Sequence, residues 1–411
     1  MTVNQDKLRE AVLKTGEIGR CPEGGITRLA FSQEYQEAVE CLKKEMTDLG
    51  MSVCVDPIGN VIGTRPGRRK ECILMGSHLD TVRNGGVFDG NLGIAAALEV
   101  IRCLNEADVV TEHTLQVVAF QAEEGGPLGG TFGSRAAMGL LDLDSPAVKE
   151  GLKAQGLCAD EIRRCQFPVE QIRYFLELHI EQGNELFYRN IPIGVVSGIV
   201  GIFRCRIVVE GESNHAGTTG MEGRKDALVA FSRLAVEIDR IAREIGDHLV
   251  ATAGVVHLWP NMANIIPGRV EAVLELRHMD RAVIEACMNQ IKEAAQADSS
   301  VSFQFETLVD KSSVACDGEI MEILEDCCRE ADYPYMVMPS RAGHDTNAVA
   351  RNIPSGMIFV PSKEGKSHCP EEWTEWADAA KGTEILLKAI EKLDERGVSN
   401  GTMECRRFPE G

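Results

Sequence analysis

Apolar residues recur at helical spacing early in the chain. Between residues 32 and 49 the apolar positions follow one another at intervals of 4, 3, 4 and 3 residues: Tyr35, Val39, Leu42, Met46 and Leu49. This spacing places them on one face of a helix. Ser32 is suited to capping its start, and Gly50 to ending it. Residues 51–55 and 60–64 then read as strands on either side of a turn.

Short apolar runs alternate with helical patterns up to about residue 202. The runs at 73–76, 115–120 and 175–180 predict buried strands, and residues 92–104 predict a helix between the first two. Strands that alternate with helices are typical of an α/β domain with a largely parallel sheet.

The pattern changes near residue 203. Strands are predicted at 203–210, 250–258, 269–277 and 301–308, with helices at 224–245 and 282–295. The order βαββαβ is the ferredoxin-like arrangement. We therefore predict an inserted domain at 203–312 within a main domain formed by residues 1–202 and 313–411.

Composition narrows the class of protein. The chain has 411 residues, a formal net charge of −20 and 44% hydrophobic residues. This charge argues against nucleic acid or an anionic membrane as a partner. The first ten residues are polar and charged, so we expect no secretory signal, and no apolar run approaches the roughly 18 residues needed to span a membrane. The 14 scattered cysteines fit free thiols in a reducing, cytoplasmic setting.

Polar residues gather at the ends of three predicted strands. The clusters are Gly-Ser-His-Leu-Asp-Thr-Val at 76–82, continued by Asp89-Gly90, then Gln-Ala-Glu-Glu-Gly at 121–125 and Glu-Leu-His-Ile-Glu-Gln-Gly at 177–183. In an open α/β sheet, ligands bind at the carboxyl ends of the strands. These clusters are therefore better site candidates than polar residues elsewhere.

The side chains in these clusters are imidazoles and carboxylates: His78, Asp80, Asp89, Glu123, Glu124 and His179. Such groups suit Zn²⁺ or Mn²⁺. A lone histidine at a strand end is more often an ordinary hydrogen-bonding residue, and an adjacent pair of glutamates usually lies at the surface. Because three strand ends carry the pattern together, a metal site is favoured.

With Ser-His-Cys-Pro-Glu-Glu at 367–372, these motifs resemble the M20-type metallohydrolases. They run from about residue 76 to 378. The segments His-Ile-Glu-Gln-Gly at 179–183 and Asn-His-Ala-Gly-Thr-Thr at 214–219 resemble one branch in particular. That branch contains N-carbamoyl-L-amino acid hydrolases, allantoate amidohydrolases and β-ureidopropionases. Related peptidases tend to place a carboxylate where His179 stands.

The resemblance implies two divalent metal ions, Zn²⁺ or Mn²⁺, and a role for each residue of the clusters. Asp89 would bridge the ions, His78 and His179 would complete one site, and Glu124 and His368 would complete the other. Asp80 would hydrogen-bond His78 and fix its tautomer. Glu123 would be the general base on the bridging water.

The resemblance also implies a role for the inserted domain as a lid and as the contact of a homodimer. His215 would reach a carbonyl oxygen in the partner subunit's site. Asn264 and Arg277 would hold the substrate carboxylate, with Gln182 and Gly343 as further contacts. On the residues alone, His215 is about as well explained as a turn histidine, and Arg277 as a member of a surface ion pair.

The implied reaction is hydrolysis of the C–N bond of an N-carbamoyl-L-amino acid or of allantoate, with release of ammonia and carbon dioxide. Arg341 stands where the family usually has glycine, so it could favour a substrate with a second carboxylate. Gly125-Gly126-Pro127-Leu128 and Gly220 also depart from the family pattern. The alternatives are a di- or aminopeptidase on the same metal architecture, and a non-catalytic binding protein on the same fold.

Overall fold

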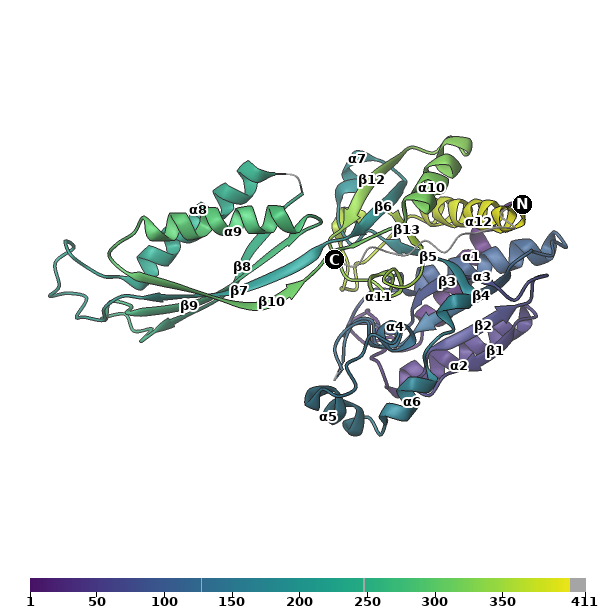
Figure 1. Cartoon of the computed structure of the whole chain (residues 1–411), viewed down its shortest axis with the longest axis horizontal. Coiled ribbons are helices and arrows are strands. Elements are labelled where there is room, and N and C mark those ends of the chain that lie inside the picture. Colours follow the sequence, from purple (N-terminus) through teal and green to yellow (C-terminus); the bar gives the residue numbers. More distant parts are fainter. Residues whose placement is uncertain (127, 247, 400–411) are drawn as a thin grey trace. The chain divides into compact units, whose positions relative to one another are not determined.

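A computed structural model describes residues 1–126, 128–246 and 248–399 (Figure 1). The chain divides into two compact units. One contains Met1–Ser197 and the segment from Cys316 onward, and the other is the inserted stretch Gly198–Ala315. The inserted unit begins and ends a few residues outside the predicted range 203–312.

The main unit is built on a mixed sheet. Its strands are β1 (Ser52–Val55), β2 (Val61–Arg65), β3 (Cys72–His78), β4 (Thr114–Phe120), β5 (Ile172–Ile180), β6 (Ile193–Ile199), β11 (Val314–Ala315), β12 (Tyr335–Ser340) and β13 (Ser355–Val360). They are ordered β1-β2-β4-β3-β5-β13-β6-β11, with β12 paired to β6. The central strands β4, β3, β5 and β13 are parallel, and the flanking pairs are antiparallel. This confirms the predicted α/β fold.

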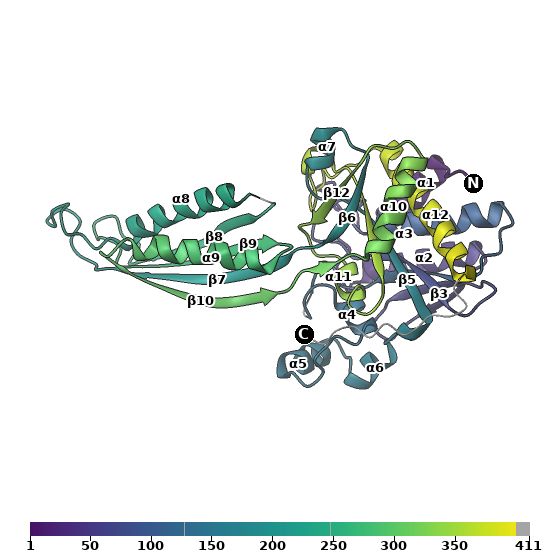
Figure 2. The same cartoon turned by 45° about the horizontal axis from the view of Figure 1, so that its top comes forward.

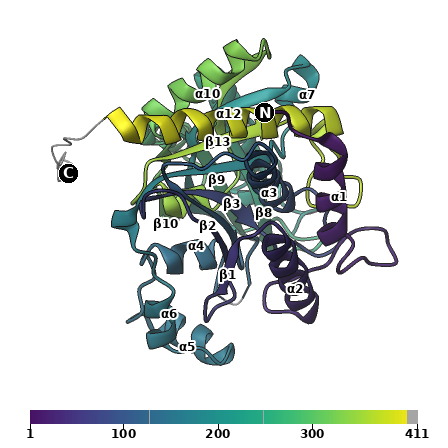
Figure 3. The ribbon, with the colours of Figure 1, turned by 90° about the vertical axis from the view of Figure 1, so that its right-hand side faces the viewer.

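Helices cover both faces of this sheet because successive side chains of a strand point in opposite directions. Ile73 and Met75 of β3 pack with α1 (Gln5–Gly16), α2 (Gln33–Asp48), α3 (Asn91–Glu106), α10 (Gly318–Glu330) and α12 (Trp376–Ser399). Leu74 belongs to the opposite face, with α4 (Phe132–Ala137) and α11 (Thr346–Val349). Figure 3 shows α1, α3 and α12 side by side. The described part of the unit also contains the short helices α5 (Pro146–Ala154), α6 (Ala159–Arg164) and α7 (Glu185–Arg189), and two 3-10 helices, Val169–Gln171 and Lys363–Gly365.

The inserted unit is a four-stranded antiparallel sheet under two helices (Figure 2). It consists of β7 (Gly201–Glu210), α8 (Ala227–Ile245), β8 (Val250–Trp259), β9 (Arg269–His278), α9 (Arg281–Gln296) and β10 (Ser302–Lys311). The strand order β10-β7-β9-β8 is the one expected from a βαββαβ chain. One face of the sheet packs on α8 and α9 to form a separate core.

Local signals in the sequence correspond closely to the observed elements. The helix predicted at 32–49 is α2, and the Ser32 hydroxyl accepts a hydrogen bond from the Tyr35 main-chain N–H at 3.2 Å.

The cysteines in the described part of the chain are free thiols, and most of them are buried. Among the described residues, no helix combines the length and apolar character that crossing a membrane requires.

The topology brings the predicted site segments to one edge of the sheet. β3, β5 and β13 run parallel, and so do β3 and β4, so their carboxyl ends lie together. His78 is the last residue of β3, residues 121–124 follow β4, and His179 lies one residue before the end of β5. The segment that contains His368 follows β13.

Substitution of Gly76 tests how tightly this edge is packed. A Cβ at Gly76 would stand 1.9 Å from the main-chain oxygen of Val118 on the neighbouring strand. We expect Gly76→Ala to lower the free energy of unfolding by roughly 3 kcal/mol, because two buried strands must separate to admit a methyl group. Gly318→Ala is the control, since a Cβ there meets nothing within 4 Å. Equal denaturation midpoints for the two variants would refute the close approach.

Candidate metal centre

His78 and His179 are held by main-chain carbonyls. The Nδ1 of His78 lies 3.0 Å from the carbonyl oxygen of Asp80, and the Nδ1 of His179 lies 2.9 Å from that of Ile180. A carbonyl oxygen only accepts, so each Nδ1 is the donor. The two Nε2 atoms then face one another at 3.5 Å, in a position to bind a metal. Both rings are 1% exposed.

Asp89 lies between two groups of ligands. Its Oδ1 is 3.3 Å from the Nε2 of His78 and 3.3 Å from the Nε2 of His179. Its Oδ2 is 3.4 Å from the Nε2 of His368, which is in turn 3.3 Å from the Oε1 of Glu124. Burial raises the pKa of Asp89, but the three histidines that face its oxygens outweigh this and hold the pKa well below its ordinary value.

These side chains form two metal-binding groups with one member in common. His78, Asp89 and His179 each offer a ligand atom within 4.8 Å of the others, and so do Asp89, Glu124 and His368. Asp89 Oδ1 and Glu124 Oε1 are buried without a hydrogen-bond donor. Buried anionic oxygens that face imidazole nitrogens fit cation binding. The five residues predicted as metal ligands are therefore brought together.

Asp80 is placed differently from the prediction. Its carboxylate lies 4.0 Å from the Nδ1 of His78, so the main-chain carbonyl of Asp80 holds that ring instead. The Asp80 carboxylate accepts hydrogen bonds from the main-chain N–H groups of Glu123 at 3.2 Å and Glu124 at 3.1 Å. Asp80 thus ties the end of β3 to the two glutamates that follow β4.

Glu123 lies beside the first group of ligands. Its Oε2 is 3.9 Å from the Nε2 of His78. Burial raises the pKa of Glu123 well above its ordinary value; a charge on His78 lowers it, but the charges of Asp345, Glu124 and Asp80 add to the increase. Gly343 borders the same carboxylate, because a Cβ there would lie 3.9 Å from Oε1. A carboxyl group with a raised pKa is suited to proton transfer near neutral pH.

Gln182 faces the second group of ligands. It adopts a left-handed backbone conformation, with φ 59°. Its side-chain Nε2 donates to Asp89 Oδ2 at 2.8 Å and lies 3.3 Å from the Nε2 of His368. The left-handed conformation costs free energy and is common at functional sites. Gln182 is thus in contact with the predicted ligands themselves.

The predicted residues of the inserted unit do not form one group within a single copy of that unit. His215 is paired with Ile265, and the main-chain N–H of Ala216 donates to the carbonyl of Asn264 at 2.9 Å. These residues lie near the Arg269 end of β9. Arg277 lies at the other end of that ten-residue strand, roughly 30 Å away.

The predicted polar residues of this unit have local partners. The Nδ1 of His215 accepts hydrogen bonds from the main-chain N–H groups of Gly217 at 3.0 Å and Thr218 at 3.2 Å, and the ring is exposed. This leaves Nε2 as the nitrogen that can contact another molecule. The Nε of Arg277 donates to Glu275 at 2.7 Å.

Arg341, which stands where the family that the sequence resembles usually has glycine, lies near the candidate metal centre. Its guanidinium is 3.8 Å from the carboxylate of Glu185, and its side chain is 44% exposed. Gly343, beside Glu123, follows two residues later. The positive charge therefore has a carboxylate partner already, and a role for Arg341 in substrate choice stays a prediction.

Several contacts around the ligands were missed by the sequence analysis. Ser367 Oγ lies 3.0 Å from Asp89 Oδ2 and 3.2 Å from Glu372 Oε2. Burial, together with the charge of Asp89, raises the pKa of Glu372 to about 7. The 367–372 motif contains both residues, but its letters give no sign of which main-chain groups they contact.

A third group of metal-ligand types is explained by hydrogen bonds. Glu177, His179 and His344 come within 4.8 Å of one another. Both oxygens of Glu177 have donors: the Ser77 hydroxyl at 2.7 Å and the N–H and hydroxyl of Thr346 at 3.0 and 2.6 Å. His344 Nε2 lies 2.9 Å from the Ser340 hydroxyl. This group therefore supports the strand ends and has no spare carboxylate oxygen for a cation.

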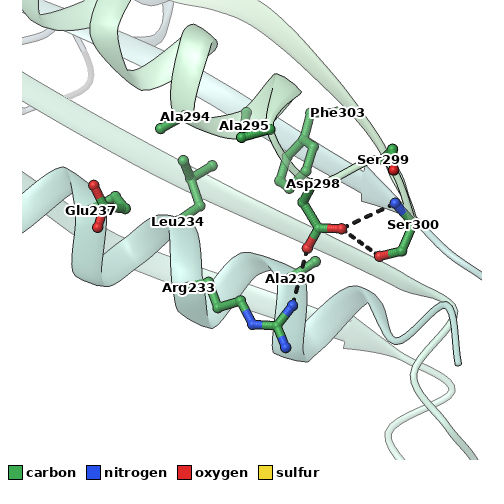
Figure 4. A pocket seen from close by; sticks show the side chains of 11 residues that line it. Ala230, Arg233, Leu234, Glu237, Ala294, Ala295, Asp298, Ser299, Ser300 and Phe303 are labelled. Carbon is green, nitrogen blue, oxygen red and sulfur yellow. Dashed lines mark hydrogen bonds and ion pairs between the residues drawn. The ribbon is translucent and has the colours of Figure 1, made fainter. Parts of the chain in front are cut away.

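A cavity of about 400 Å³ lies in the inserted unit between α8 and α9 (Figure 4). Small residues such as Ala230 and Ala294 leave the space, and Arg233 pairs with Asp298 at 3.4 Å across its rim. Asp298 also accepts from Ser300. Its lining includes no histidine or cysteine. This cavity shares no residue with the candidate metal centre.

Comparisons of the sequence and of the structure with known proteins agree with one another. Residues 74–392 match the model of peptidase family M20/M25/M40. An N-carbamoyl-L-amino acid amidohydrolase of Geobacillus stearothermophilus is 36% identical over 405 residues, covering 95% of this chain and 99% of the relative. An allantoate amidohydrolase of Escherichia coli is also 36% identical, covering 94% and 98%. A hydantoinase/carbamoylase family amidase from Burkholderia multivorans has a similar structure, with a TM-score of 0.86, 30% identity and coverage of 95% and 97%.

Gly90 offers a test of the ligand geometry. It has φ 66°, and a Cβ there would lie 2.5 Å from the Nδ1 and Cε1 atoms of His78. We expect Gly90→Ala to displace the His78 ring and to reduce metal affinity about 10- to 100-fold. Metal content after dialysis, measured by atomic emission, checks this. Gly220→Ala is the control, because a Cβ there meets nothing within 4 Å. Wild-type metal content in Gly90→Ala would contradict the assignment of His78.

Proposed function

Because the chain belongs to the M20/M25/M40 peptidase family, we propose that it is a metal-dependent amidohydrolase that cleaves the C–N bond of a small N-carbamoyl (ureido) acid. The observation that carries the proposal is the pair of ligand groups that share Asp89, with Glu123 beside them. Relatives named N-carbamoyl-L-amino acid amidohydrolase and allantoate amidohydrolase support the substrate class.

The two groups would hold two divalent cations, Zn²⁺ or Mn²⁺. Such a pair lowers the pKa of a water molecule and polarises the substrate carbonyl. Glu123 would then take the proton of the attacking water and deliver it to the leaving nitrogen. The bond between the carbonyl carbon and that nitrogen breaks, giving the free amine and carbamate, and the carbamate decomposes to ammonia and carbon dioxide.

The substrate is proposed to be an acid, either an N-carbamoyl-L-amino acid or allantoate. Arg277 would hold its carboxylate, because the guanidinium fork matches two carboxylate oxygens. Asn264, Gln182 and Gly343 would supply further contacts. An M20-type di- or aminopeptidase is the second candidate, and the imidazole of His179 argues against it. A non-catalytic role is disfavoured because the ligand set and Glu123 are all present.

We propose further that the enzyme is a cytoplasmic homodimer joined through the inserted unit, which serves also as a lid. The edge strand β8 supports this, since among the described residues its one strand partner is β9, and it exposes Val255, Val256 and Trp259. An open strand edge with exposed apolar side chains is suited to pairing with a second copy. The separation of His215 and Asn264 from Arg277 along β9 is also compatible with a substrate held by two subunits.

Removal of the proposed base should abolish turnover without removing the metals. We expect Glu123→Gln to lower kcat about 10³-fold because the amide cannot accept the proton of water. Ammonia release from allantoate, N-carbamoyl-α-amino acids and N-carbamoyl-β-alanine, with dipeptides assayed in parallel, is the measurement. Unchanged metal content is the control. Faster hydrolysis of dipeptides than of every ureido acid by the wild-type enzyme would favour the peptidase instead.

Hybrid dimers test catalysis across subunits. His215→Ala and Glu123→Ala homodimers are each expected to be inactive. After mixing and reassembly, a hybrid contains one site with both residues intact, so roughly a quarter of wild-type activity should return in a random mixture of C₂ dimers. Mass spectrometry of the intact dimers verifies the exchange. Exchange without recovery of activity would show that His215 does not act in the partner's site.

A further inference from the structure

Two segments far apart in the sequence meet at a buried carboxylate. The Oε1 of Glu372 accepts hydrogen bonds from the main-chain N–H groups of Phe88 at 3.0 Å and Asp89 at 3.1 Å. Its Oε2 lies 3.2 Å from the Ser367 hydroxyl, which is itself 3.0 Å from Asp89 Oδ2. Glu372 therefore contacts the main chain of Asp89 directly and the side chain of Asp89 through one hydroxyl.

The side chain of Glu372 is buried and closely surrounded. The residue is 4% exposed. A Cβ at Gly86 would lie 2.0 Å from its Oε1, so the absence of a side chain at Gly86 makes room for the carboxylate. The main-chain N–H of Glu372 donates to the carbonyl of Cys369 at 3.1 Å, which closes the turn immediately after His368. The turn that follows the metal-ligand candidate His368 thus supplies the contact to another candidate, Asp89.

Simple cohesion between the segments does not require this carboxylate. The ring of Phe88 already packs on Trp373, at 5.5 Å between centroids, and on Trp376, at 5.0 Å. Burying a carboxylate close to the charge of Asp89 costs free energy. The carboxylate adds a constraint on the orientation of the Asp89 segment, because hydrogen bonds restrict angles as well as distances, whereas apolar contacts do not.

We propose that Glu372 is a positioning residue, which orients the carboxylate of Asp89 so that one oxygen faces each group of metal ligands. It does so by accepting from the main-chain N–H groups of Phe88 and Asp89. It also shares with Asp89 the hydroxyl of Ser367, whose single proton is donated to one of the two carboxylates at a time. Hydrogen bonds to a metal-binding carboxylate fix its orientation and affect metal affinity. This inference rests on the proposed function, since it assumes that Asp89 binds metal.

The test compares Glu372→Ala, Glu372→Gln and Glu371→Ala in the full-length protein. Co²⁺ is titrated into the metal-free proteins against a competing chelator, and the visible spectrum of the bound ion is recorded. Glu372→Ala should bind Co²⁺ about 10- to 100-fold more weakly and with an altered spectrum. Glu372→Gln should restore binding close to wild type. Its Oε1 can accept both main-chain N–H groups, and its NH₂ group can donate to Ser367.

A control variant and a milder variant distinguish a loss of positioning from a loss of folding. Glu371 is the exposed neighbour of Glu372, and Glu371→Ala should behave as wild type. If Glu372→Ala does not fold, as judged by thermal unfolding of the metal-free protein, Ser367→Ala removes only the hydroxyl between the carboxylates. It should weaken Co²⁺ binding in the same direction.

Three results would overturn the proposal. One is wild-type Co²⁺ affinity and spectrum in Glu372→Ala, or in Ser367→Ala where that variant replaces it. Another is a Glu372→Gln variant as weak as Glu372→Ala, which would assign the effect to charge and not to hydrogen bonds. A wild-type protein that binds no Co²⁺ would overturn the proposed function first, and this inference with it.

Discussion

The buried carboxylate of Asp89 is the group around which the rest of the site is organised. Its two oxygens face different sets of ligands, His78 and His179 on one side and His368 with Glu124 on the other. An uncompensated carboxylate in such a position is costly, and nearby positive charge offsets the cost. In the protein alone, the surrounding histidines keep the pKa of Asp89 low. Two cations would satisfy the same requirement.

The parallel centre of the sheet explains why such distant residues meet. β3, β4, β5 and β13 end at the same edge, and each is followed by or contains part of the site. Main-chain groups then do much of the positioning. Carbonyl oxygens of Asp80 and Ile180 hold the two histidine rings, and the N–H groups of Glu123 and Glu124 are held by Asp80. The geometry of the metal ligands is therefore a property of the strand ends as well as of the side chains.

The inserted unit differs from the main unit in the direction of its strands and in having its own core. Its sheet is antiparallel, its core is its own, and its candidate residues lie at two ends of β9. A rigid strand of that length keeps His215 and Asn264 apart from Arg277 within one copy. We propose that two copies assemble through the edge of β8, so that residues from both ends of the sheet contact substrate.

The sequence by itself determined the element types and the chemistry of the candidate metal centre. Helical and alternating periodicities are local, and so α2, α3 and the βαββαβ order could be predicted from neighbouring residues. Imidazoles and carboxylates at three strand ends indicated metal binding for the same reason. Only the tertiary structure decided which hydrogen-bonding group positions which ligand side chain. The carbonyl of Asp80, not its carboxylate, binds His78, and Glu372 contacts residues 284 and 283 positions away. Such contacts depend on main-chain atoms, which every residue possesses, and on long-range packing, so no local pattern of side chains reveals them.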